Sequence, residues 1–194
     1  MEITKPIKGQ LSVVGQELTN VPADLGEKYG SETKILDLSH NQLKKLENLE
    51  KFTLLKSLIA DSNDLESEQE FPLIPSLNTL CVNDNDISDI EHFLDVINKS
   101  FPNLTYLSML KNPACPNYFI GKDQEDYQRY RYYVLHKLKN LKFLDSTPVS
   151  EEERKEAMRV GAFMKVARPQ SNQEEKEENG DYDYGKHKHK KNKP

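Results

Sequence analysis

Residues 36–46 read LDLSHNQLKKL, and the same spacing of leucine and asparagine returns at four other places in the chain. The shared pattern is L-x-L-x-x-N-x-L with conservative replacements. The other copies are LSVVGQELTNVP from residue 11, LIADSNDL from residue 58, LCVNDNDISDI from residue 80 and LSMLKNPAC from residue 107. The asparagine position is held by Gln16, Asn41, Asn63, Asn85 and Asn112, at successive spacings of 25, 22, 22 and 27 residues.

This repeat has a specific physical meaning. Alternating leucines predict a short strand with one apolar side, and the asparagine can turn the chain and bond backbone groups of the next coil. No single copy can bury its apolar side alone, so the copies must stack. The period lies within the range of leucine-rich repeats. We therefore predict the α/β class, as a leucine-rich-repeat solenoid with short parallel strands on its concave face.

Two of the connections between copies are longer than the others. IEHFLDVINKSF, residues 90–101, places Phe93, Leu94, Ile97 and Phe101 at helical spacing, which predicts a helix on the convex side. DLESEQEFPLIPSL, residues 64–77, contains Pro72 and Pro75 and is predicted to be an irregular loop.

The stretch DYQRYRYYVLHKL, residues 126–138, allows two interpretations. Aromatic residues interleaved with arginine are typical of surfaces that stack on single-stranded nucleic acid. However, one helical face gathers most of the apolar residues, as expected for a lid over the last repeat. The residues assigned to this lid are Tyr127, Tyr130, Val134, Leu135 and Leu138. The lid is the favoured interpretation, and it leaves Arg129, Tyr132, Tyr133 and His136 unassigned.

The chain after this helix should contain one degenerate strand, in LKNLKFLD, and a last helix. Ser150 is the predicted N-cap of that helix, with Glu153 as its capping-box partner and Gly161 as its stop. We expect leucine-rich repeats over residues 1–122, a C-terminal helical cap over 123–169 and a disordered charged tail over 170–194. The tail has almost no aliphatic residues and holds six acids and six lysines, so the rest of the chain carries the formal net charge of −5.

The concave face is the predicted binding surface. Residues that flank the strand leucines should project onto it, including Asp145 in the last strand. Apolar anchors with a charged surround are typical of protein interfaces. The candidate partner-binding residues are Ile35, Asp37, Ile59, Asp61, Tyr106, Leu110 and Phe143.

No catalytic, metal or cofactor site is expected. Cys115 has no evident histidine partner, and Cys81 is interpreted as a small contact residue. No glycine-rich stretch suits a phosphate. Asp61, Asp84 and Asp86 lack the spacing of an EF-hand. Two cysteines are too few for a disulfide framework, which favours a reducing compartment.

The C-terminal half resembles a known family. NPACPN, DYQRYR and GAFMKVARP are similar to the capped region of the leucine-rich melanocyte differentiation-associated protein family, and the resemblance covers roughly residues 11–169. The more general part, YRYYVLHKLKNLKFLD, is shared with SDS-type leucine-rich proteins, including the A-prime subunit of a spliceosomal particle.

The resemblance implies a non-catalytic adaptor that binds Rab-family small GTPases in endosomal or lysosome-related organelle traffic, and hence a cytoplasmic protein peripheral to those membranes. It also implies a link to the Commander/Retriever recycling machinery through a C-terminal tail. The tail here ends in KHKHKKNKP and does not match the family's tail, so we do not extend that link to this chain. The alternative function is a nuclear ribonucleoprotein assembly subunit. Direct nucleic-acid binding is disfavoured by the negative charge.

Overall fold

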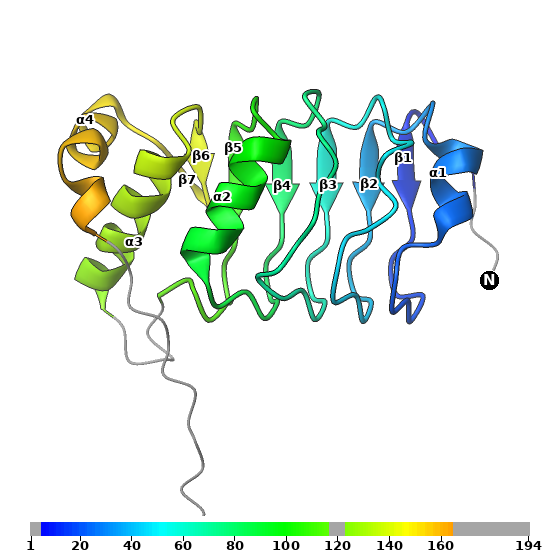
Figure 1. Ribbon diagram of the computed structural model, residues 1–194, viewed down its shortest axis with the longest axis horizontal. Helices are drawn as coiled ribbons and strands as arrows, with labels where there is room; N and C mark the ends of the chain where they lie inside the picture. The colour runs from blue at the N-terminus through cyan, green and yellow to red at the C-terminus, as the bar shows by residue number, and fades with distance from the viewer. Residues whose placement is uncertain (1–4, 117–122, 165–194) are drawn as a thin grey trace, which may run out of the picture.

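The computed structural model describes residues 5–116 and 123–164, and its strands form one seven-stranded sheet in chain order (Figure 1). The first six strands are parallel, and the seventh pairs antiparallel with the sixth. The strands are β1 (Gln10–Ser12), β2 (Ile35–Asp37), β3 (Ser57–Ile59), β4 (Thr79–Cys81), β5 (Tyr106–Ser108), β6 (Phe143–Leu144) and β7 (Thr147–Pro148). The predicted leucine-rich-repeat solenoid is confirmed.

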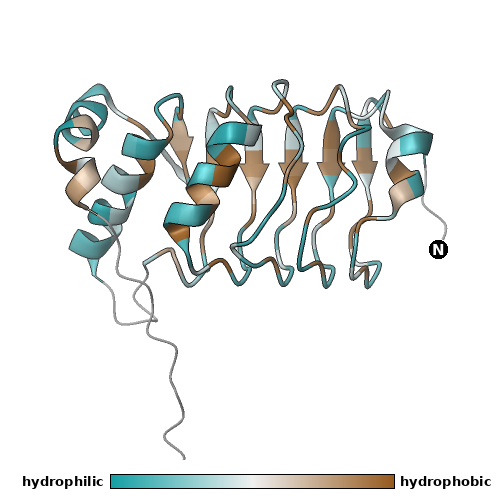
Figure 2. Cartoon of the chain, in the orientation of Figure 1, coloured by the Kyte–Doolittle hydropathy of each residue, from teal (hydrophilic) through white to brown (hydrophobic). Residues whose placement is uncertain are grey.

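The strands stack in strict register because each contributes the same leucine to the core. Leu11 pairs with Leu36, and the row continues through every parallel strand to Leu144. These central leucines are fully buried, and hydrophobic residues concentrate along the strands (Figure 2). Burying one leucine side chain contributes about 1.5–3 kcal/mol. The row therefore supplies a large part of the force that holds one repeat on the next.

A ladder of asparagines links consecutive repeats, as the sequence predicts. Asn63 is typical: its Oδ1 accepts a hydrogen bond from the backbone N–H of Leu43 at 3.0 Å, and its Nδ2 donates to the carbonyls of Leu38 and Ala60. Asn41, Asn85 and Asn112 make equivalent bonds to the repeat before them. Gln16 differs, because its side chain is exposed and donates to the carbonyl of Val14 in its own repeat. Buried backbone groups that face no strand are satisfied by these amides.

The residue just before each of these positions has a left-handed backbone. Gly15, His40, Ser62, Asp84 and Lys111 have φ between 54° and 66°. This conformation turns the chain out of the strand and directs the following asparagine into the core. Only one of the five is glycine, so the sequence gives no warning of the turn.

Helices cover the remaining apolar surfaces. Helix α1 (Ala23–Tyr29) lies at the N-terminal end, and α2 (Ile90–Ser100) is the predicted helix between β4 and β5 (Figure 1). Asp89 caps α2 by accepting from the N–H of His92, and Phe93, Leu94, Ile97 and Phe101 are buried. Residues 64–77 contain neither helix nor strand, which confirms the predicted loop.

Helix α3 (Gln124–Lys137) closes the C-terminal end of the solenoid. Asp123 and Asp126 form a capping box at its start. Of the predicted lid residues, Tyr130, Val134, Leu135 and Leu138 are buried, while Tyr127 is half-buried and packs against the core. The lid interpretation of the DYQRYRYYVLHKL stretch therefore agrees with the structure.

Helix α4 (Glu151–Val160) and the short helix η2 (Gly161–Phe163) pack on α3. The hydroxyl of Ser150 accepts from the N–H of Glu153, as predicted, but the Glu153 side chain bonds Arg131 and does not complete a capping box. Gly161 follows α4, yet its φ of −57° is right-handed. Its role is close packing, because a Cβ there would lie 2.5 Å from Cβ of His136.

Within the described residues no helix is both long enough and apolar enough to cross a bilayer. The predicted tail, residues 170–194, lies outside the described residues.

Candidate functional site

The seven candidate binding residues lie on one face of the sheet, on or just after β2, β3, β5 and β6. Ile35 and Asp37 flank the buried leucine of β2, and Ile59, Tyr106 and Phe143 hold matching places on β3, β5 and β6. Asp61 and Leu110 follow β3 and β5 by two residues. Because side chains alternate along a strand, residues on either side of a buried leucine point to the opposite side of the sheet. Six of the seven are half-buried, and Phe143 is 44% exposed.

The C-terminal end of this face is aromatic. Tyr106 and Phe143 are register partners on β5 and β6, and their rings stack with centroids 6.1 Å apart and an angle of 29°. Leu110, two residues after β5, is partly buried and packs against the core. A large, partly exposed aromatic pair is the kind of side chain that dominates protein interfaces.

The N-terminal end of the face carries two carboxylates. Oδ1 of Asp37 accepts from the backbone N–H of Ser39 at 3.0 Å, and Oδ1 of Asp61 accepts from the N–H of Asn83 at 2.8 Å and its Nδ2 at 3.1 Å. Asp37 is paired in register with Ile59, two residues before Asp61, so the two carboxylates are diagonal neighbours. Diagonal positions lie about 7–8 Å apart, within reach of one long side chain.

Asn83 links the two ends of the face. Its Oδ1 accepts from the Ser108 hydroxyl at 2.7 Å and from the N–H of Leu110 at 2.8 Å, while its own amide group donates to Asp61. Hydrogen bonds therefore connect Asp61, Asn83, Ser108 and Leu110 across three neighbouring repeats. Asn83 holds the position in its repeat that Asp61 and Leu110 hold in theirs. The repeat register therefore predicts where Asn83 lies, but it does not predict the hydrogen bonds that Asn83 makes.

Electrostatics on this face disfavour a nucleophilic cysteine. Burial raises the pKa of Cys81 to about 11, and the charges of Asp61 and Asp37 add to the increase. A thiol with this pKa is protonated at neutral pH and a poor nucleophile. Cys115 is buried, and its burial raises its pKa to about 12. No group of three potential metal-ligating side chains occurs in residues 5–116 and 123–164.

The prediction that Asp145 projects onto the concave face is wrong. Asp145 is 1% exposed, and a φ of 57° turns it inward. Its Oδ1 accepts from the N–H of Met109 and its Oδ2 accepts from the Tyr127 hydroxyl, both at 2.9 Å. It thus ends the ladder as the asparagines do in earlier repeats, but with a carboxylate whose pKa is raised by burial.

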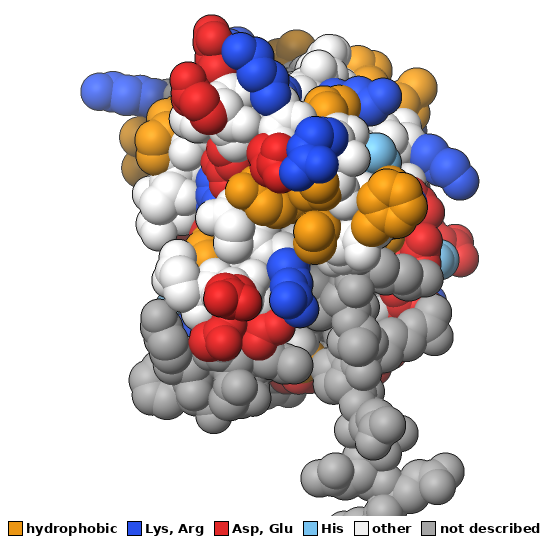
Figure 3. Space-filling view, turned by 90° about the vertical axis from the view of Figure 1, so that its left-hand side faces the viewer, with side chains coloured by type: hydrophobic (Ala, Val, Ile, Leu, Met, Phe, Trp, Pro, Cys, Tyr) orange, Lys and Arg blue, Asp and Glu red, His pale blue; other side chains and the backbone are white. Residues whose placement is uncertain are grey.

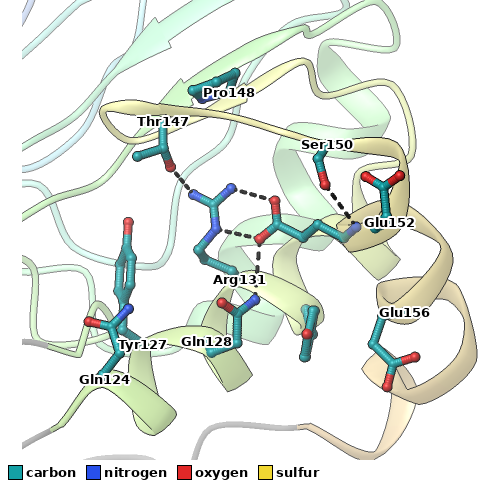
Figure 4. A pocket seen from close by; sticks show the side chains of 11 residues that line it. Gln124, Tyr127, Gln128, Arg131, Thr147, Pro148, Ser150, Glu152 and Glu156 are labelled. Atoms are coloured by element: carbon teal, nitrogen blue, oxygen red, sulfur yellow. Dashed lines mark hydrogen bonds and ion pairs between the residues drawn. The ribbon is translucent and has the colours of Figure 1, made fainter.

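A hollow of about 600 Å³ lies between α3 and α4 (Figure 4). Arg131 occupies its floor: Nε and Nη2 bond the Glu153 carboxylate at 2.6 and 2.8 Å, and Nη1 donates to the Leu144 carbonyl and the Thr147 hydroxyl. Since Arg131 is 5% exposed and four of its five N–H groups are bonded, it holds α4 against the solenoid and presents little free surface to an anion.

The tyrosines of α3 do not form a stacking platform. Tyr130 and Tyr133 are 0% and 3% exposed, and Lys137 lies over the Tyr133 ring with its Nζ 5.9 Å from the centroid. Tyr127 and Tyr132 are half-buried and pack on the core. Of the four residues left unassigned by the lid, only Arg129 is exposed. These placements remove the feature that favoured nucleic-acid stacking.

The outer end of the cap exposes some apolar side chains among charged ones (Figure 3). On α4 and η2 the exposed large ones are Met158, at 39%, and Phe163, at 86%. Single exposed apolar side chains are common on protein surfaces, so they do not define a site.

Comparison with known proteins agrees with this architecture. A family model described as leucine-rich repeat matches residues 16–170. The human leucine-rich melanocyte differentiation-associated protein is 46% identical over 147 residues, which cover 73% of this chain and 74% of that protein. The chain therefore belongs to the leucine-rich repeat proteins, and among them to the leucine-rich melanocyte differentiation-associated protein family.

More distant relatives belong to a nuclear particle. The U2 small nuclear ribonucleoprotein A′ of Arabidopsis thaliana is 32% identical over 124 residues, 63% of this chain, and the match spans 45% of that protein. The human protein of the same name is 29% identical, also over 45% of its length. Among solved structures, a chain of the Drosophila melanogaster SNF/U2A′ complex superposes with a TM-score of 0.64 at 24% identity, covering 78% of this chain and 80% of that one. This likeness shows the shared fold.

Proposed function

We propose that this protein is a non-catalytic adaptor that binds a protein partner on its concave face. The observation that carries the proposal is the concave row itself: a stacked aromatic pair at one end, two carboxylates at the other, and aliphatic Ile35 and Ile59 among the carboxylates. This mixture of apolar anchors and oriented polar groups is typical of protein interfaces. Repeat proteins present such surfaces on their concave side.

The partner class that we propose is a Rab-family small GTPase, in endosomal or lysosome-related organelle traffic. Its support is membership in the leucine-rich melanocyte differentiation-associated protein family, together with the implied role of that family. In this proposal the protein works in the cytoplasm, at the surface of those organelles.

The experiment is a binding panel. The full 194-residue chain is immobilised and exposed to purified Rab proteins, each loaded with GTP or with GDP. We expect at least one GTP-loaded member to be retained more strongly than its GDP form. Failure of every member to bind in either state would contradict the Rab assignment.

A second candidate function is a subunit in ribonucleoprotein assembly. It is favoured by the superposition on a chain of the SNF/U2A′ complex and by the U2 small nuclear ribonucleoprotein A′ relatives. In that complex the superposed fold assembles with a protein partner. Recovery of spliceosomal proteins and RNA with the tagged chain, without any Rab that responds to nucleotide, would select this candidate over the first.

A further inference from the structure

The concave face has two chemistries, and they lie at opposite ends. Asp37 and Asp61 belong to the β2–β3 end, while Tyr106, Leu110 and Phe143 belong to the β5–β6 end. Neighbouring strands are about 4.8 Å apart, so the three steps from β2 to β5 separate the two ends by about 14 Å. The side chains between them on β4, Thr79 and Cys81, are small and uncharged at neutral pH.

The carboxylates at the first end are already oriented. Every hydrogen bond that the described residues make to Asp37 and Asp61 reaches Oδ1, which leaves Oδ2 of each open to a partner. Neither carboxylate forms a salt bridge within the described ranges. Both carboxylates are half-buried, and Ile35 and Ile59 hold adjacent positions on β2 and β3. A fixed, partly desolvated carboxylate loses little conformational entropy when it pairs with a cation.

The second end is built to accept an apolar group. The stacked rings of Tyr106 and Phe143 present a large, rigid surface, and the half-buried Leu110 adds an aliphatic edge. No charged residue is present among these three, in contrast with the first end. The negative potential of the first end reaches the middle of the face, since the charges of Asp61 and Asp37 contribute to the raised pKa of Cys81.

We propose that the concave face takes a protein segment that carries a lysine or arginine and an apolar side chain about 14 Å apart, with the basic group on Asp37 and Asp61 and the apolar group on Tyr106, Leu110 and Phe143. This inference rests on the proposed use of the concave face for binding, and it adds the chemistry and the direction of the bound segment. The asymmetry favours one orientation, because reversal would place an apolar group on two carboxylates and would leave the basic group without a carboxylate partner.

A displayed library of random 15-residue peptides tests this assignment. The full chain is the bait, and peptides that also bind the Ile59→Arg variant are removed, because an arginine beside Asp37 and Asp61 would repel a basic group and occupy the carboxylates. We expect the enriched peptides to share a basic and an apolar residue. A spacing of about 14 Å corresponds to four or five residues if the peptide is extended, and to about nine if it is helical.

Two outcomes of the selection would overturn the proposal, and they are distinguishable. Enriched peptides that depend on Ile59 but lack a basic residue would refute the inference while supporting a concave binding surface. Absence of any peptide that distinguishes the wild type from Ile59→Arg would refute both the inference and the proposed surface.

Variants of each end then check the direction. For an enriched peptide, we expect the double substitution Asp37→Asn and Asp61→Asn to weaken binding about 10-fold at low salt, and the loss to shrink as salt rises. The control is Asp64→Asn, which removes one carboxylate at an exposed residue beyond the asparagine turn and should leave binding unchanged. Phe143→Ala should weaken binding about 10-fold at every salt concentration. A loss of equal size from Asp64→Asn, or a Phe143→Ala effect that varies with salt like that of the aspartates, would refute the assignment of the two ends.

Discussion

The repeat stack and the C-terminal cap solve the same problem with different chemistry. In the stack, neutral asparagines satisfy buried backbone groups, and each repeat offers the next one the same surface. The cap does not pack against a further repeat. It is held by the buried ion pair of Arg131 and Glu153 and by the buried carboxylate of Asp145. A periodic structure can repeat the same uncharged asparagine contact in every copy. Its end requires contacts that are found in no other repeat. The stack should therefore tolerate local damage, and the cap should fail at single residues.

The largest effect is expected from Leu135→Asp in the lid. Leu135 is fully buried on α3, and a carboxylate there would have no partner in an apolar core. We expect α3 and α4 to detach, with loss of more than about 4 kcal/mol from the free energy of unfolding. Hydrogen exchange measures this directly: protection should vanish in 124–160 and persist in β1–β4. Uniform loss of protection along the chain would contradict a separable cap.

The next effect concerns the ion pair. Arg131→Met leaves the Glu153 carboxylate, with its side chain only 15% exposed, without its cation. Breaking one side of a buried pair costs about 3–5 kcal/mol, whereas replacing both sides with apolar residues is often neutral. We expect Arg131→Met to lower stability in urea denaturation, and Arg131→Met with Glu153→Leu to recover most of the loss. A double variant as unstable as the single one would show that the bonds of Arg131 to Leu144 and Thr147 matter more.

A smaller loss is expected from Asn63→Ala in the stack. The carbonyls of Leu38 and Ala60 keep other partners, in Asn41 and Asn85. The N–H of Leu43 is left without its acceptor, at a cost of about 2 kcal/mol. The measurement is the midpoint of urea unfolding. If Asn63→Ala lost more stability than Arg131→Met, the expectation that single substitutions damage the cap more than the repeat stack would be contradicted.

The smallest effect is the acid sensitivity of the cap. Burial opposes the charged form of Glu153, but the hydrogen bonds and charge of Arg131 outweigh it, so its pKa is lowered below its ordinary value. A lowered pKa adds stability above the unfolded-state value of about 4.3, and the gain is lost as pH falls through the folded-state value. Glu153→Gln should remove this part of the acid dependence in unfolding experiments between about pH 6 and 3. Asp145 acts in the opposite direction, because its raised pKa makes its contribution decline as pH rises.

The sequence predicts the stack more completely than the cap, for a physical reason. Five copies of one pattern place the core leucines, the asparagines and the rows of the concave face in register, so Ile35, Ile59 and Tyr106 follow by counting. The cap sequence occurs only once, so no comparison between copies helps to predict its structure. Helical periodicity locates the buried face of α3, but not the pairing of Arg131 with Glu153, because two helices must first be placed in space.

The features that the sequence pattern does not predict lie in the same region. The strand pattern alone puts Asp145 on the concave face, but its left-handed backbone turns the side chain toward Met109 and Tyr127. Gly161 is the helix stop that the sequence predicts, since α4 ends at Val160, but close contact with α3 is what requires glycine there. Neither the left-handed backbone of Asp145 nor the close packing at Gly161 can be predicted from the spacing of residues in the sequence. The limits of the repeats, cap and tail at residues 122 and 169 stay predictions.

The central claim, that a protein partner occupies the concave face, is tested most directly by Ile59→Asp. Ile59 is half-buried on β3, at the carboxylate end of the face, and an aspartate there replaces an apolar contact with a charge without touching the leucine core. The measurement is retention of the Rab that binds the wild-type chain, with a thermal melt of each protein. We predict at least about a 10-fold loss of retention with the melting temperature within a few degrees of wild type. Unchanged retention by a folded Ile59→Asp protein would contradict the claim.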